Sequence, residues 1–157
     1  MSKYYLLLLY CLPYLLVFYS ALYFPQDPDL GWHLKYGEYF FQHGKILWEN
    51  TFSHLMPGYH WINTSWGIDV IDYFIFSNFG FLGLMLAGAS VITATFFFFS
   101  RAFKLTALEQ AIIFPFLLFL EKVLINQSFK GQAVSILFLS IQMYLLECFP
   151  TSFDISS

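Results

Sequence analysis

Residues 25–66 read PQDPDLGWHLKYGEYFFQHGKILWENTFSHLMPGYHWINTSW, a polar stretch that separates two strongly apolar parts of the chain. The stretch opens with Asp27-Pro28-Asp29 and contains every histidine and every tryptophan of the protein. These residues are His33, His43, His54, His60, Trp32, Trp48, Trp61 and Trp66. We therefore expect recognition or chemistry in this stretch, at the boundary between membrane and water.

The composition is typical of an integral membrane protein. Hydrophobic residues make up 59% of the 157 residues and charged residues only 11%, which leaves too little polar surface for a soluble domain of this size. The formal net charge of −3 argues against a nucleic-acid partner, which would require a basic face. Cys11 and Cys148 both lie in apolar segments, and their spacing predicts two small buried side chains rather than a metal site or a disulfide.

The apolar segments predict an all-α integral membrane protein, a single membrane domain over residues 1–157 with about four transmembrane helices. The predicted spans are residues 4–24, 81–99, 107–125 and 133–149, and residues 150–157 are expected to be a disordered tail. The first span lacks a small-residue cleavage pattern, so we expect it to be retained rather than removed as a signal peptide. Thr106 and Glu109 have the spacing of a capping box at the start of the third span.

Four spans place both termini on the same side of the membrane. Lys3, Arg101 and Lys104 fall on that side and favour it as the cytoplasmic one. The opposite side carries Lys35, Lys45, Lys122 and Lys130, but the first two lie in a long loop with its own carboxylates and carry less weight. Lys122 and Lys130 lie where the third and fourth spans meet the outer surface, as snorkelling side chains or as a site for an anionic headgroup.

The large outer loop, residues 25–79, is expected to hold two interfacial helices. The first covers about residues 30–43, because Asp29 is a favourable N-cap and Gly44 a favourable C-terminal residue. Pro28 restricts Asp27 to an extended conformation. The apolar side of this first helix should lie along the membrane.

The second interfacial helix covers about residues 65–79, beginning near Thr64 or Ser65 and ending at Gly80. Asp69 and Asp72 lie one helical turn apart on it, with apolar residues around much of the remaining surface. Two carboxylates would be costly at the centre of a bilayer. We therefore expect Asp69 and Asp72 to form a solvated helix face.

Asp27, Asp29 and His33 are the residues whose types suggest chemistry. Carboxylates in a cavity at the membrane boundary act as a general base towards an acceptor hydroxyl or hold a divalent cation. The structural alternative is that Asp29 caps a helix, Asp27 is solvated and His33 makes an interfacial hydrogen bond. The histidine spacings match no common zinc pattern, so no metal site is predicted from them. The tryptophans fit an interfacial aromatic belt, which leaves sugar stacking open as a further role.

One part of the loop resembles a known family. The run Asp27-Pro-Asp-Leu-Gly-Trp-His-Leu-Lys-Tyr-Gly-Glu38, followed by Gly44, Phe52-Ser53, Gly58, Trp61 and Trp66, is similar to the first outer loop of bacterial polytopic glycosyltransferases of the GT-C superfamily. Members often read DPDxWWHLxxGxxI, a glycine, DxFSxTxxGxxW and then EWL. Gln132-Ala-Val-Ser135 also resembles the RPQxxS stretch of the family. The chain departs from the pattern at Gly31, Asn50, Ser65, Lys130 and Gly131.

The resemblance implies an enzyme of the bacterial inner (cytoplasmic) membrane that transfers a sugar from a polyprenyl-phosphate donor to an acceptor at the outer face. It implies that Asp27 or Asp29 is the catalytic carboxylate, with a divalent cation at this pair as an open alternative. The residues expected to contact substrate are His33, Glu38, Trp61, Trp66, Lys122 and Lys130.

Length sets a further expectation. Family members usually carry eight or more spans, so this chain would be a fragment, inactive alone, whose missing carboxyl-terminal part lies on another chain. The alternative is a non-enzymatic multispan membrane protein whose outer loop docks a partner subunit.

Overall fold

The computed structural model describes residues 3–25, 27–49, 55, 58–60, 63–125 and 131–149. Within these ranges the chain is all-helical, as predicted, and its only β-type pairing is an isolated bridge between Glu49 and His60. The helices are α1 (Lys3–Ala21), α2 (Leu30–His43), α3 (Trp66–Ala102), α4 (Ala107–Ile125) and α5 (Gly131–Cys148). The tail predicted over residues 150–157 lies outside the described residues.

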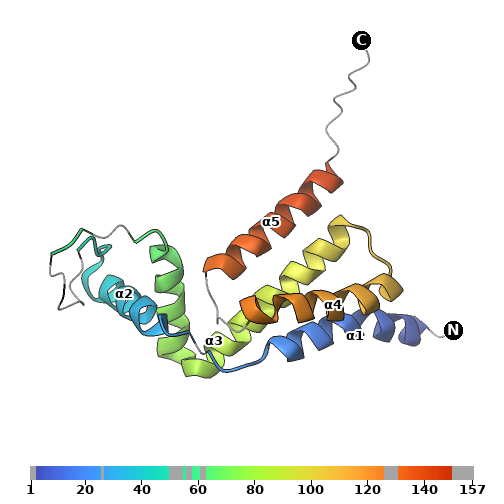
Figure 1. Cartoon of the computed structure of the whole chain (residues 1–157), viewed down its shortest axis with the longest axis horizontal. Helices are drawn as coiled ribbons and strands as arrows, with labels where there is room; N and C mark the ends of the chain where they lie inside the picture. The colour runs from blue at the N-terminus through green and yellow to red at the C-terminus, as the bar shows by residue number, and fades with distance from the viewer. Residues whose placement is uncertain are drawn as a thin grey trace, which may run out of the picture.

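Helix α3 makes its main contacts with α1, α2 and α5 and organises the fold (Figure 1). Helix α2 packs against its first part, α1 and α5 pack against the remainder, and α4 packs against α1. The molecule is therefore bent, with α2 at one end and a bundle formed by α1, α4, α5 and the rest of α3 at the other.

Gly80 produces the bend in α3. Its φ of 61° and ψ of −155° lie in a region that only glycine adopts readily. Gly80 breaks the helical geometry, as the sequence predicts, but the helix resumes at once. The predicted interfacial helix and the predicted second span are therefore two arms of one 37-residue helix.

Local end signals set the other boundaries. Gly44 has the left-handed φ of 65° expected at the end of α2, and its N–H bonds to the carbonyl oxygen of Phe40. At the start of α4, the N–H and hydroxyl of Thr106 donate to the carboxylate of Glu109 at 2.7 and 2.8 Å, which is the predicted capping box.

Two helices, α3 and α5, are long and apolar enough to cross a membrane by length and composition. The described apolar stretches of α1 and α4, Leu8–Ala21 and Ala107–Phe119, are shorter. Large apolar side chains are exposed on these helices, including Leu15, Ile112, Phe119, Phe138 and Leu146. Such a surface is expected in contact with lipid or with further helices.

The apolar core of the bundle is small. Val17, Phe96 and Phe114 are buried together where α1, α3 and α4 meet, and Phe114 contacts Phe96 edge-on with 4.9 Å between ring centroids. The prediction that both cysteines are buried is wrong. Cys11 and Cys148 are exposed, because the core forms around aromatic and branched side chains on other faces of their helices.

Candidate functional site

Helices α2 and α3 approach each other closely enough to bring their polar side chains together. Gly37 is buried against the backbone of Asp69 and the side chain of Tyr73. His33 lies one helical turn before Gly37, so its imidazole faces the first turns of α3. Because Gly37 has no side chain, the backbones of α2 and α3 approach each other there, and this approach places His33 against Asp69.

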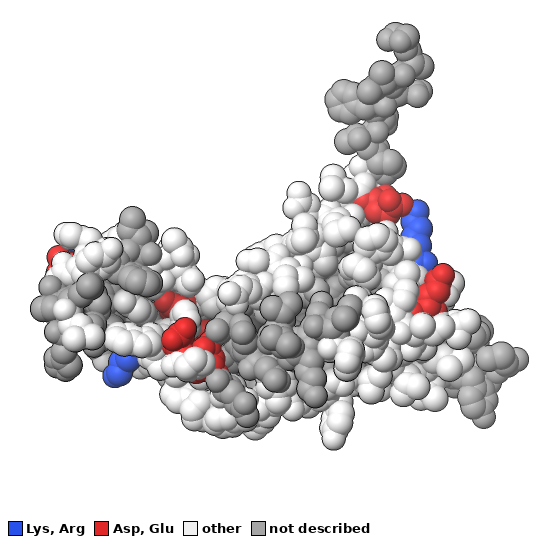
Figure 2. All heavy atoms as spheres, in the orientation of Figure 1, with Lys and Arg blue, Asp and Glu red and all other residues white. Residues whose placement is uncertain are grey.

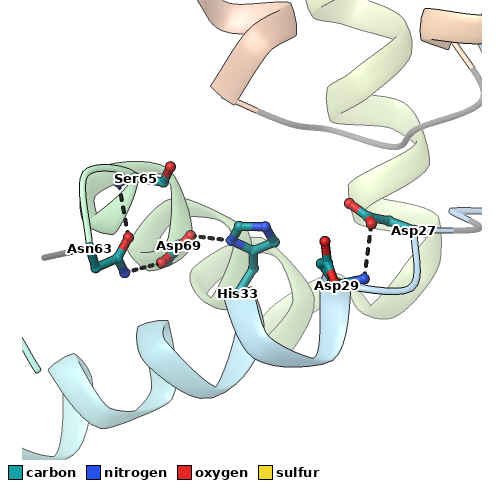
Figure 3. A network of polar contacts seen from close by, with 6 residues as sticks. All are labelled: Asp27, Asp29, His33, Asn63, Ser65 and Asp69. Carbon is teal, nitrogen blue, oxygen red and sulfur yellow. Dashed lines mark hydrogen bonds and ion pairs between the residues drawn. The ribbon is translucent and has the colours of Figure 1, made fainter. Parts of the chain in front are cut away.

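His33 and Asp69 form the centre of a hydrogen-bonded network (Figure 3). The Nδ1 atom of His33 lies 2.7 Å from Oδ1 of Asp69. The amide of Asn63 donates to Oδ2 of the same carboxylate at 2.5 Å, and Oδ1 of Asn63 accepts a hydrogen bond from the N–H of Ser65 at 2.9 Å. Both oxygens of Asp69, which is only 1% exposed, are thus occupied, as a buried carboxylate requires.

This network changes the acidity of His33. The hydrogen bond to Asp69 raises the pKa of His33 above its usual value of 6.5, whereas partial burial acts in the opposite direction. The charges of Asp69, Asp27 and Asp72 add to the rise. His33 therefore retains its proton, and a positive charge, to a higher pH than an isolated imidazole does.

Asp72 lies one turn after Asp69 and differs from it in having an unsatisfied oxygen. The residue is 2% exposed, and its Oδ1 has no hydrogen-bond partner among the described residues. The expectation that Asp69 and Asp72 form a solvated face is therefore wrong. Their spacing does place them on one face, but that face is covered by packing and borders a cavity instead of water.

The cavity has a volume of about 570 Å³ and lies where the starts of α2, α3 and α5 meet. Its acidic and basic lining residues are Asp29, His33, Asp69 and Asp72. The remaining wall combines hydroxyl, amide and apolar groups: Thr64, Ser65, Ile68, Gly131, Gln132, Val134, Ser135 and Phe138. The cavity thus has charged and polar groups from α2 and α3 on one side and a mixed polar and apolar wall from α5 on the other.

The two predicted catalytic carboxylates occupy different positions. Asp29 is exposed, lines the cavity and holds the N-cap position of α2 without a side-chain capping bond. Asp29 thus occupies the predicted N-cap position, but its side chain makes no capping hydrogen bond. Its N–H donates to Oδ1 of Asp27 at 2.9 Å. In Figure 3, Asp29 lies next to His33 at the start of α2, and Asp27 lies beyond Asp29.

Among the other predicted substrate contacts, Glu38 and Trp66 lie away from this cavity's described wall. Glu38 accepts a hydrogen bond from Lys35 at 2.6 Å on the outer side of α2. Trp66 packs near Phe40, with 6.1 Å between ring centroids. The predictions for Trp61, Lys130 and the side chain of Lys122 concern groups outside the described part of the structure.

The sequence analysis missed Asn63, Asp69 and Asp72 as members of the site. The sequence does contain a signal for Asp69 and Asp72, because two carboxylates one turn apart in an apolar segment are unexpected unless other groups pair with them. Among the described residues, no three His, Cys, Asp or Glu side chains gather in an arrangement that could hold a metal ion. The cation at Asp27 and Asp29 stays a prediction.

On the face drawn in Figure 2, charged groups form two clusters, and single charged groups lie at the α2 end. Acidic groups lie between the α2 end and the bundle, and a second group of both signs lies at the far end of the bundle.

Comparison of the chain with models of protein families, with curated proteins and with solved structures finds no match.

Proposed function

We propose that this protein is the amino-terminal part of a membrane glycosyltransferase, which passes a sugar from a polyprenyl-phosphate donor to an acceptor hydroxyl at the outer membrane face. The cavity at the starts of α2, α3 and α5 is its active site. One observation carries the proposal: Asp29, His33 and the buried, unsatisfied Asp72 line the same cavity. The similarity of residues 27–66 to the first outer loop of GT-C glycosyltransferases supports it.

The reaction needs a base and a stabilised leaving group. The acceptor oxygen forms a bond to the anomeric carbon of the sugar, the bond from that carbon to the phosphate oxygen breaks, and polyprenyl phosphate leaves with the electron pair. The acceptor's proton passes to a carboxylate, for which exposed Asp29 is placed at the cavity edge. Asp27 holds the backbone of Asp29 and adds negative charge beside it.

His33 is assigned to the leaving phosphate. Its pKa is raised chiefly by the hydrogen bond to Asp69, so the imidazole is more readily cationic. With Nδ1 engaged by Asp69, Nε2 of the ring is the nitrogen left to donate to a phosphate oxygen. A cation fixed in this way stabilises charge that develops during bond cleavage.

Asp72 is assigned to the sugar. Burial raises the pKa of Asp72 to about 8, so the side chain is mainly a protonated acid at neutral pH. A buried carboxyl oxygen without a donor is unfavourable, and a sugar hydroxyl can donate a hydrogen bond to it. Sugars carry several hydroxyl groups, which also match Ser65, Gln132 and Ser135 in the same wall. Val134 and Phe138 then provide an apolar path for the first isoprene units of the donor.

The placement of each helix relative to the membrane is part of this proposal. We place four spans in the inner membrane of a bacterium, with α1 and α4 crossing beside α3 and α5. Helix α2 and the first arm of α3 lie at the outer interface. The large exposed apolar side chains of α4 and α5 fit lipid on one side and, by similarity to longer family members, further spans of a second chain on the other. A divalent cation at Asp27 and Asp29 is the alternative role for that pair.

The test uses membranes of the source cell, which contain the acceptor and any second chain. A photoreactive, radiolabelled polyprenyl-phosphate hexose should label the wild-type chain and yield a labelled glycosylated product. Asp29→Asn should lower product formation by at least about a hundredfold, the range expected for loss of a general base, while labelling of the chain persists. Glu49→Gln, at an exposed carboxylate outside the cavity, is the matched control.

Two outcomes would overturn the proposal. Equal product formation by wild type, Asp29→Asn and Asp27→Asn would remove the catalytic assignment. Labelling no stronger than that by a polyprenyl alcohol lacking sugar and phosphate would favour the other class, a non-enzymatic protein whose outer loop docks a partner subunit.

A further inference from the structure

A second polar cavity lies at the other end of the bundle. It has a volume of about 620 Å³ and is lined by the middle of α1, the end of α3, the start of α4 and the end of α5. Figure 1 shows the ends of α3 and α5 on the same side of the molecule, away from α2. The first cavity is bordered by the start of α5 and this one by its end, so the two are separate sites.

We propose that this second cavity binds the headgroup of an anionic phospholipid, specifically a phosphate diester that carries a free hydroxyl, as in phosphatidylglycerol. The proposal does not depend on the sugar-transfer activity. It rests on the cation Arg101, the buried amide of Gln110 and the apolar surface around the opening.

Arg101 supplies the charge for the phosphate. It lines the cavity in the last turn of α3. Its carbonyl oxygen accepts a hydrogen bond from the N–H of Lys104, whereas its guanidinium has no hydrogen bond or ion pair within the described part of the chain. Lys104 lines the same cavity but is already engaged in an ion pair with Glu147. Arginine suits a phosphate because its planar guanidinium donates two parallel hydrogen bonds to two oxygens.

Gln110 supplies the specificity for a hydroxyl. It is 3% exposed and lines the cavity. Its Nε2 donates to the carbonyl oxygen of Leu105 at 3.0 Å, which fixes the orientation of the amide, because a flipped amide would leave two carbonyl-type oxygens facing each other. The Oε1 atom is buried and has no partner among the described residues, so a hydrogen-bond donor that reaches it from the cavity would satisfy it. A ligand that both donates a hydrogen bond and carries negative charge therefore matches Gln110 and Arg101.

The surroundings favour a lipid over a soluble phosphate ester. Phe97 lines the cavity and is 45% exposed, and the neighbouring Phe103, Leu108 and Ile112 are also exposed large apolar residues. Such side chains suit acyl chains beside the headgroup. Arg101 and Lys104 also belong to the side that the distribution of positive charge favours as cytoplasmic, where anionic lipid is attracted to basic residues.

Cys11 and Cys148 allow a direct test, because both are exposed and both line this cavity. The rate of their labelling by a maleimide is measured in nanodiscs of phosphatidylcholine alone, with phosphatidylglycerol added, or with phosphatidylmethanol added. Phosphatidylmethanol has the same charge as phosphatidylglycerol but no headgroup hydroxyl. We expect phosphatidylglycerol to slow labelling by about tenfold, the ratio for one charge-assisted hydrogen bond, and phosphatidylmethanol to slow it less.

Variants separate the two recognition elements. Arg101→Gln should abolish protection by both anionic lipids, whereas Lys45→Gln, an exposed cation in the other half of the molecule, should leave it unchanged. Gln110→Met should remove only the preference for phosphatidylglycerol over phosphatidylmethanol. Because Arg101 is exposed, its variant keeps the test valid even where replacement of buried Gln110 impairs folding.

Equal labelling rates for the wild-type protein in all three nanodiscs would overturn the proposal. So would full protection by soluble glycerol phosphate in phosphatidylcholine nanodiscs, since the ligand would then be a free phosphate ester. An unchanged lipid preference in a folded Gln110→Met variant would refute the role of the amide.

Discussion

A Cβ atom at Gly37 would lie 2.1 Å from the carbonyl oxygen of Asp69, so α2 and α3 meet there backbone against backbone. The whole candidate site depends on this contact, because His33 is carried on the same face of α2, one turn earlier. Any side chain at position 37 must push the two helices apart.

The first prediction concerns that contact. Gly37→Ala should lower the free energy of unfolding by about 1–3 kcal/mol, the usual cost of overpacking a tight contact, and should lengthen the bond between His33 and Asp69. The measurements are thermal unfolding in detergent and NMR titration of His33, whose pKa should fall.

Gly31→Ala is the matched control, since a Cβ at Gly31 meets nothing within 4 Å and the helix should gain slightly from alanine. If Gly37→Ala and Gly31→Ala behave alike, the close approach of α2 and α3 is not present in solution.

The second prediction is a pH dependence of stability from His33. Its pKa is raised in the folded protein by the hydrogen bond to Asp69, so folding favours the protonated ring. The stabilisation is complete below about pH 6.5, the pKa of histidine in an unfolded chain. It is lost as the pH rises through the raised pKa of folded His33.

Chemical unfolding of wild type and His33→Gln across this interval gives the measurement. The difference in free energy of unfolding between them should shrink as pH increases. His43→Gln is the control, because that histidine is exposed and bonds only to a backbone carbonyl of its own helix. A difference that grows with pH would contradict the assigned role of Asp69.

The third prediction separates stability from activity at Asp72. Replacing the buried carboxylate by an amide in Asp72→Asn should raise the free energy of unfolding by about 1 kcal/mol, because an unsatisfied buried acid is costly. The same change should reduce sugar transfer. Asp29→Asn, at an exposed position, should alter stability by less than about 0.5 kcal/mol.

The paired readouts are thermal unfolding and product formation with the labelled donor. A destabilised Asp72→Asn protein would indicate that the Oδ1 atom has a partner in the folded molecule, and the sugar-binding role of Asp72 would then lose its basis.

The fourth prediction tests the bend in α3. Gly80→Ala should cost about 1–3 kcal/mol, since a non-glycine residue is strained at a φ of 61° and a ψ of −155°. Gly67→Ala is the control because Gly67 lies in the same helix without a positive φ or a neighbour within 4 Å.

Spin labels at exposed positions 41 and 97 then report the distance between the two halves of the molecule. A straightened α3 should change this distance in Gly80→Ala but not in Gly67→Ala. Identical distance distributions in all three proteins would show that another contact holds the bend.

The sequence predicted those features that depend on neighbouring residues in the chain. Helix α2 coincides with the predicted 30–43, because Asp29 and Gly44 bound it locally. The capping box of Thr106 and Glu109 is likewise a contact over three residues. Such signals are complete within one turn of helix and do not need knowledge of the rest of the fold.

Features that depend on packing between distant segments were not predictable in the same way. The spacing of Asp69 and Asp72 shows that they share a face, but only the position of α2 decides that this face is covered. His33 was identified for its residue type, whereas its partner lies 36 positions further along the chain. The exposure of Cys11 and Cys148 is likewise decided by which faces of α1 and α5 meet α3.

The bend at Gly80 has a mechanical consequence. The two arms of α3 line different cavities, with Asp72 on the short arm before Gly80 and Ser100 on the long arm after it. As long as the bend angle at Gly80 is kept, rotation of the long arm about its own axis moves the short arm, together with α2, through an arc. A turn of the far end of α3 would therefore displace the acidic cavity sideways, a coupling that a straight helix would lack.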